Sequence, residues 1–136
     1  MTGRTLGQRF RAQFTGDDWA GATQTVLVAL SGGLDSLVLL HLLRFEEGLP
    51  EMRLLAAHFD HRMRSSSGLD AEWVRGLCRA WAVPLHLGQA ASIPTSEETA
   101  REARYEFLLG SKNQGDASWL LTAHHADDLF AFGVAC

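Results

Sequence analysis

The sequence predicts an α/β fold in which a parallel β-sheet carries helices on both faces. Four short runs of aliphatic and β-branched residues alternate with longer segments of helical periodicity, which is the pattern of βαβ units. The runs are nearly continuous in apolar residues, as is typical of strands that are covered on both faces. A glycine-rich turn separates the first run from the helix that follows it. The predicted strands cover residues 24–30, 52–60, 83–88 and 118–124.

The helical segments follow the strands in order. The predicted helices cover residues 4–14, 35–45, 70–81 and 96–112. In the first, apolar residues recur at every fourth position, which predicts an amphipathic helix. The third has an apolar face that includes Trp73. In the fourth, Ser96 is suited to cap an acidic first turn, and we expect Tyr105 and Phe107 to pack against the sheet.

Composition limits the class of protein. A chain of 136 residues with 46% apolar and 21% charged residues suits one domain with a packed core. The net charge of −4 argues against strong electrostatic binding of nucleic acid by this chain alone, although it allows a local basic patch. Cys78 and Cys136 form no C-x-x-C pair, which favours free thiols over a metal site. With no apolar run of roughly 18 residues and no signal-peptide core, we expect a cytoplasmic protein without a membrane span.

The turn after the first strand has the geometry of a phosphate site. It consists of six consecutive residues, Ser31, Gly32, Gly33, Leu34, Asp35 and Ser36. The two glycines can adopt positive φ and let a ligand approach the backbone, while the turn amides and the helix N-terminus attract anions. The two serines add hydroxyl donors. The spacing matches neither G-x-x-x-x-G-K-[ST] nor G-x-G-x-x-G.

Asp35 points to a metal ion in this turn. A carboxylate repels phosphate directly, so we expect Asp35 to act through Mg²⁺, which prefers carboxylate, water and phosphate oxygens. The alternative is a tight turn that only caps the helix. In open α/β sheets ligands bind at the carboxyl ends of the strands, where this turn lies.

Polar residues also gather after the second and fourth strands. The second strand ends in His58, Asp60 and His61. We expect them to form a polar rim around a nucleotide; the alternatives are a metal site and polar strand-end residues without a role. Titratable residues also crowd the end of the fourth strand, which favours a site over a plain loop or a metal centre. These residues are His124, His125, Asp127 and Asp128.

Two arginines lie on one face of the fourth helix. Arg101 and Arg104 are three residues apart, and arginine forks suit phosphate or carboxylate groups. The alternative is that both form solvated salt bridges with the glutamates of the same helix.

These stretches resemble a known family. "SGGLDS" after a buried strand resembles the pyrophosphatase loop of the N-type ATP pyrophosphatases, which release pyrophosphate and adenylate a substrate oxygen. "AAHFDHRMRSSSGLDAEWVRGLC", "EETAREARYEFL" and "LTAHHADD" resemble segments of the tRNA(Ile)-lysidine synthetase family in its order and spacing, over about residues 24–128. The resemblance implies a Rossmann-like adenine nucleotide alpha-hydrolase (HUP-like) fold.

The resemblance also implies a reaction. ATP and Mg²⁺ activate the C2 carbonyl oxygen of the wobble cytidine of tRNA(Ile), and free lysine then displaces AMP to form lysidine. It implies ATP binding by residues 31–36 and a metal role for Asp35 and for Asp127 or Asp128. His124 would stabilise charge, and the second aspartate would face the attacking amine. The catalytic residues it implies are Asp35, Asp60, Arg104, His124 and Asp128.

The sequence departs from the family after Asp128. There "LFAFGVAC" stands in place of Gln-Ala-Glu-Thr and a leucine-arginine helix. We therefore expect residues 1–136 to form one domain that is incomplete at its C-terminus and lacks the family's C-terminal tRNA-binding domains, so that ATP binding is weak at most and lysidine formation absent. The alternatives are a tRNA thiolation enzyme, whose catalytic cysteine pairs are absent here, a nucleotide-binding module of the universal-stress type, and an inactive remnant.

Overall fold

A computed structural model describes residues 6–14, 16, 19, 23–31, 33–62 and 67–123. Of the predicted site residues, Gly32, His124, Asp127 and Asp128 lie outside these ranges, as does His125. The strands are β1 (Gln24–Leu30), β2 (Met52–Asp60), β3 (Leu85–Gln89) and β4 (Trp119–Leu121). The helices are α1 (Leu6–Arg11), continued by the 3-10 turn η1 (Ala12–Phe14), then α2 (Leu34–Phe45), α3 (Ser67–Ala80) and α4 (Glu97–Gln114).

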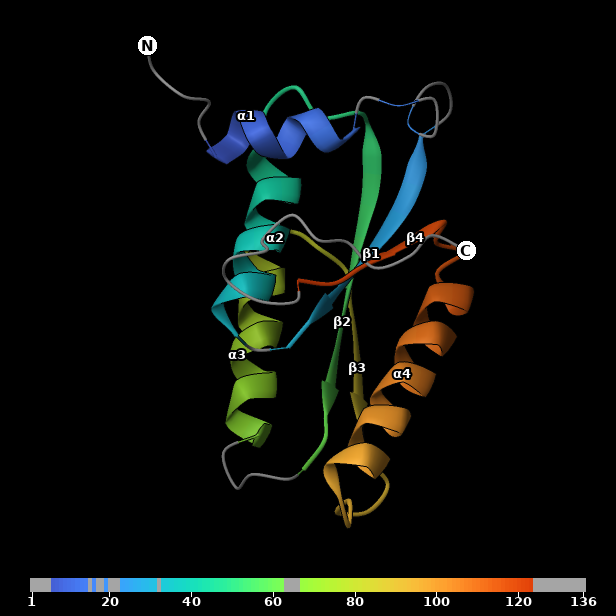
Figure 1. Cartoon of the computed structure of the whole chain (residues 1–136). Helices are drawn as coiled ribbons and strands as arrows, with labels where there is room; N and C mark the ends of the chain where they lie inside the picture. Colours follow the sequence, from blue (N-terminus) through green and yellow to red (C-terminus); the bar gives the residue numbers. More distant parts are fainter. Residues whose placement is uncertain are drawn as a thin grey trace.

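The four strands form one parallel sheet in the order β3-β2-β1-β4. The chain moves outward from β1 to β3 and then crosses back to add β4 on the other side of β1. Figure 1 shows α1, α2 and α3 on one face of the sheet and α4 on the other. This arrangement confirms the predicted α/β fold with helices on both faces. The crossover places a topological switch point between β1 and β4.

The apolar core has two layers because successive strand residues point to opposite faces. On the side of α2 and α3, Val26, Val28 and Leu30 pack in one buried cluster with residues of both helices. On the side of α4, Leu27 and Ala29 pack in a second cluster with Leu108. The continuous apolar run of β1 is therefore explained by burial of both of its faces.

The helix boundaries follow local signals. The Ser96 hydroxyl caps α4 by accepting a hydrogen bond from the backbone N–H of Thr99 at 3.1 Å, as its sequence predicts. Helix α3 begins three residues earlier than expected, and β4 ends at Leu121, three residues before the predicted end. Within the described residues, no helix combines the length and the apolar composition that crossing a bilayer requires.

Two aromatic residues lie differently from the prediction. Trp73 is 55% exposed because Val74 and Cys78, which are fully buried, form the inward line of α3. Tyr105 is 41% exposed and does not pack against the sheet, which is instead covered by neighbouring positions of α4. Phe107 does pack as expected, with its ring centroid 5.4 Å from that of Phe59.

Candidate functional site

The turn between β1 and α2 is held by its two serines. The Ser36 hydroxyl, 2% exposed, donates to the Gly33 carbonyl at 3.1 Å and accepts from the backbone N–H of Ser31 at 3.1 Å. The Ser31 hydroxyl lies 3.2 Å from that of Ser36 and accepts from the Gly33 N–H at 3.1 Å. Each serine has one hydroxyl proton, and that of Ser36 is used inside the turn in the bond to the Gly33 carbonyl. That both hydroxyls donate to a phosphate stays a prediction.

The donors that remain open are backbone amides. Gly33 is the N-cap of α2, and no side chain caps the helix there. The first amides of the helix, those of Leu34 and Asp35, have no intrahelical acceptor by geometry. Leu34 is 75% exposed and Asp35 is in the first turn, so this helix end faces solvent with its partial positive charge. The arrangement suits an anion together with a cation held by Asp35.

Gly33 serves close packing rather than left-handed backbone. Its φ of −87° and ψ of 165° are extended and open to any residue, which corrects the expectation of positive φ at this glycine. A Cβ at this position would lie 3.3 Å from the Ser31 hydroxyl oxygen. A larger residue would therefore displace the Ser31 hydroxyl and weaken the hydrogen bonds that shape the turn.

The end of β2 supplies two buried polar side chains beside this turn. His58 is paired in register with Leu30, the last residue of β1, and its Nδ1 donates to the Leu30 carbonyl at 2.8 Å. Because a carbonyl oxygen can only accept, Nδ1 carries the proton in this contact. Asp60 follows two residues later and is 6% exposed. It pairs in register with Gln89 of β3.

Asp60 is held by its neighbours on both oxygens. Its Oδ1 accepts from the backbone N–H of Arg62 at 3.0 Å, and its Oδ2 accepts from the Gln89 amide at 3.4 Å. Arg62 adopts a φ of 62°, a left-handed conformation that non-glycine residues rarely take, and its guanidinium donates to the carbonyls of Ala90 and Ala91. The chain therefore turns sharply after β2 while β3 holds the carboxylate in place.

These contacts involve residues that sequence reasoning did not select. Arg62 and Gln89 are not among the predicted site residues, and for His58 the sequence leaves open a polar rim, a metal site or a strand end without a role. The signal for Gln89 is the register that pairs it with Asp60, which a linear pattern does not contain. Within the described ranges, no three His, Cys, Asp or Glu side chains gather closely enough to share a metal ion.

Helix α4 presents two arginines around one aromatic ring. The guanidinium carbons of Arg101 and Arg104 lie 5.7 Å and 5.9 Å from the ring centroid of Tyr105. Across the described part of the chain, neither arginine forms an ion pair with a glutamate of the helix, so the salt-bridge alternative is not what the structure shows. Toward the residues that the structure describes, both retain free donors for an anion.

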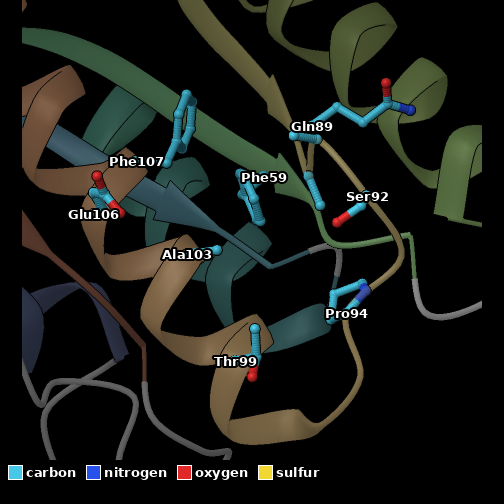
Figure 2. A pocket seen from close by; sticks show the side chains of 10 residues that line it. Phe59, Gln89, Ser92, Pro94, Thr99, Ala103, Glu106 and Phe107 are labelled. Atoms are coloured by element: carbon cyan, nitrogen blue, oxygen red, sulfur yellow. The ribbon is translucent and has the colours of Figure 1, made fainter.

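A cavity of about 430 Å³ opens between α4 and the ends of β2 and β3. Figure 2 shows Phe59, Ala103, Thr99 and Pro94 around it. Its wall is largely apolar, with the Phe59 and Phe107 rings side by side. The structure thus gathers Asp35, His58 and Asp60 at the carboxyl ends of β1 and β2, while Arg104 comes from the helix on the other face.

Comparison with known proteins identifies the family. Residues 6–131 match the PP-loop domain, a family of ATP-binding domains. The chain belongs to the PP-loop domain family. Membership implies that the chain uses ATP, and the "SGGLDS" turn after β1 is the segment that resembles the family's loop. The predicted family is therefore confirmed.

The curated relatives of this PP-loop domain include several bacterial enzymes. The chain is 43% identical over 112 residues to tRNA(Ile)-lysidine synthase of Thermotoga maritima, covering 76% of this chain and 27% of the relative. It is 34% identical over 125 residues to tRNA(Ile)-lysidine synthase of Lactiplantibacillus plantarum, covering 89% and 28%. The chain thus spans about a quarter of the length of these relatives.

A solved structure supports the fold. The U34-tRNA thiolase NcsA from Methanococcus maripaludis, solved with its [4Fe-4S] cluster, superposes with a TM-score of 0.72 at 18% sequence identity. The match covers 90% of this chain and 45% of the thiolase. At this identity the likeness shows a shared Rossmann-like PP-loop fold.

Proposed function

We propose that the chain is the ATP-dependent catalytic domain of a tRNA(Ile)-lysidine synthase, which joins lysine to C2 of the wobble cytidine of tRNA(Ile) in the cytoplasm. The observation that carries the proposal is the "SGGLDS" turn, which leads into the N-terminus of α2. This turn lies at the carboxyl edge of the sheet, beside the topological switch point between β1 and β4. The similarity to tRNA(Ile)-lysidine synthases supports the choice of substrate within the PP-loop family.

The proposed reaction has two steps. The C2 carbonyl oxygen of cytidine attacks the α-phosphorus of ATP, which forms the adenylate and releases pyrophosphate. The neutral ε-amine of lysine then forms a bond to C2, the bond from C2 to the adenylate oxygen breaks, and AMP and one proton leave. Both steps depend chiefly on positioning and on stabilising charge, since negative charge moves between phosphate oxygens.

The residues of this chain divide these tasks. The open amides at the start of α2 bind the phosphates, and Asp35 with Asp127 would hold Mg²⁺, which shields phosphate charge when bound. Arg104 and His124 neutralise charge on the reacting groups. Asp60 and Asp128 would accept a proton from the attacking amine. Asp35 suits the cation because its half-buried carboxylate lies in the first turn of α2 beside the anion-binding amides.

Calorimetric titration of the chain with ATP and Mg²⁺ tests the nucleotide site. We expect the wild type to bind ATP and Asp35→Ala to lose at least tenfold in ATP affinity (about 1.4 kcal/mol per tenfold). Removing one ligand of a cation that is bound to phosphate weakens the binding of the cation and of ATP. Glu47→Ala, an exposed acidic residue after the far end of α2, is the matched control and keeps wild-type affinity. Absence of ATP binding by a chain that melts cooperatively contradicts the proposal.

Thiolation, the activity in the name of the structural relative, is disfavoured by the described cysteine. Cys78 is 1% exposed, and burial raises the pKa of its thiol from 9.0 to about 11. A thiol that stays protonated at neutral pH is a poor nucleophile or metal ligand. Cys78 therefore acts as a core residue of α3.

A further inference from the structure

We propose that a cavity at the amino edge of the sheet, where the parallel strands begin, binds a small phosphate monoester with an apolar body. The cavity has a volume of about 340 Å³, which is in the range of small-molecule sites. It is lined by the last turn of α2, the first residues of β2 and the segment that leads into β3. It therefore lies at the opposite end of the strands from the "SGGLDS" turn, and the inference goes beyond the proposed function.

The cavity exists because β2 begins before β3 has a residue beside it. The two strands pair only from Ala56 and Leu85 onward, so residues 52–55 of β2 have no neighbour on that side. Figure 1 shows β2 beginning farther toward this end of the sheet than β3. The Ala56 N–H donates to the Pro84 carbonyl at 2.9 Å, and backbone groups alternate in direction along a strand. The Leu54 N–H therefore points to the same side, and among the described residues it has no acceptor there.

Arg44, which lines the cavity, is held by two neighbours. Its Nε donates to the Trp81 carbonyl at 2.8 Å. Its guanidinium carbon lies 5.1 Å from the ring centroid of Phe45, and that ring packs edge-on against the Trp81 ring with centroids 5.5 Å apart. With Nε used, the Nη groups of the fork remain as donors for an oxyanion. Because the side chain is already ordered, it loses little conformational freedom when a ligand binds.

Arg53 supplies a second guanidinium to the lining. It is exposed, and it forms no hydrogen bond, ion pair or ring contact with the residues that the structure describes. Its neighbours Met52 and Leu54 pack on the side of α2 and α3, so alternation places Arg53 on the other face of β2. Because β3 does not reach this level, both faces of the strand border the same opening.

The donors and the wall together indicate the class of ligand. Two arginine forks and one backbone N–H suit the three terminal oxygens of a phosphate monoester better than the two oxygens of a carboxylate. The described lining contains no Asp or Glu, although the whole chain has a net charge of −4. The other lining side chains are apolar, among them Leu43, Met52 and Val83. An anion that carries an apolar body covers this surface, whereas a bare ion leaves it in contact with water.

The two cavities at the carboxyl edge fit an anion less well. The cavity beside α4 has one carboxylate, that of Glu106, and no lysine or arginine in its described lining. A cavity of about 310 Å³ beside α3 has Arg75 together with the carboxylates of Asp60 and Glu72, which repel an anion. The amino-edge cavity differs from both because its charged side chains are all cationic.

Titration of the chain with phenyl phosphate, followed by nuclear magnetic resonance, tests the assignment. We expect saturable binding, with inorganic phosphate and phenol each bound at least about tenfold more weakly, because each lacks one of the two parts that the cavity contacts. Arg44→Gln and Arg53→Gln should each weaken phenyl phosphate binding by about tenfold. Arg79→Gln, in the last turn of α3 and outside the cavity lining, is the matched control and keeps wild-type affinity.

A second titration in the presence of ATP and Mg²⁺ separates this cavity from the nucleotide turn. We expect the affinity for phenyl phosphate to stay unchanged, because the two sites lie at opposite ends of the strands. No binding, displacement by ATP, or full affinity in Arg53→Gln overturns the assignment; Arg53 makes no contact that holds the fold, and circular dichroism confirms that each variant is folded. Absence of ATP binding together with Arg53-dependent binding of phenyl phosphate supports this cavity and refutes the proposed function.

Discussion

Replacing Ser36 by alanine tests whether the turn after β1 is shaped by its own side chains. The Ser36 hydroxyl is 2% exposed and makes three contacts, with the Gly33 carbonyl, the Ser31 N–H and the Ser31 hydroxyl. Losing a buried acceptor costs about 1–3 kcal/mol for the donor left without a partner. Ser31 is exposed, and the Gly33 carbonyl still accepts from the Leu37 N–H at 3.4 Å, so water and this bond recover part of the loss. We expect a net cost of about 2 kcal/mol.

Urea unfolding followed by circular dichroism measures this cost. For a domain of this size, about 2 kcal/mol lowers the melting temperature by roughly 8 °C. The matched control is Ser118→Ala, an exposed serine just before β4, which we expect to stay within about 0.5 kcal/mol of the wild type. ATP affinity should fall in Ser36→Ala as the turn loses its shape. A variant as stable as the control, with unchanged ATP affinity, would show that the serine contacts do not hold the turn.

Two further perturbations follow from packing and burial. Gly88→Ala places a Cβ against the Phe107 ring, so we expect a loss of about 1–3 kcal/mol in urea unfolding. The control is Gly76→Ala on α3, where a Cβ meets nothing within 4 Å, and we expect its free energy of unfolding to rise by up to about 1 kcal/mol. A Gly88→Ala variant as stable as Gly76→Ala would refute the close contact with Phe107. Burial raises the pKa of Cys78 from 9.0 to about 11, so the unfolded thiol ionises first and the unfolding free energy falls as pH rises from 9 to 11. Thermal melts across that range, in a Cys136→Ser background, should show a melting temperature that falls as pH rises. The fall should be smaller in Cys78→Ala, and an equal fall with and without Cys78 would exclude its thiol as the cause.

The order of strands and helices was predictable because it depends on local patterns. The unbroken run Val26–Leu30 predicts a strand buried on both faces, and the Ser96 cap marks the start of α4. The exposure of Trp73 and Tyr105 was not predictable from helical spacing. Spacing places a residue on a broad face, whereas burial depends on which positions the sheet reaches.

In the candidate site, too, the features set by local sequence were predictable and the contacts between distant residues were not. The turn could be found from "SGGLDS" because a glycine-rich segment between a strand and a helix has few other uses. The contacts of His58 with Leu30 and of Asp60 with Gln89 could not, because each joins residues 28 or 29 positions apart and depends on strand register. Propensity and periodicity contain no information about register between parallel strands that a crossover helix separates.

The alternation of side chains along β2 gives one sheet edge two different chemistries. Phe59 lines the apolar cavity beside α4, and Asp60 lines the charged cavity beside α3. Neighbouring residues of a strand point to opposite faces, so a slip of one residue in the pairing of β2 would put the carboxylate under α4 and the aromatic ring under α3. The pairing of His58 with Leu30 and of Asp60 with Gln89 fixes β2 from both sides against that slip. Strand register, rather than any one side chain, therefore keeps the charged cavity beside α3 apart from the apolar cavity beside α4.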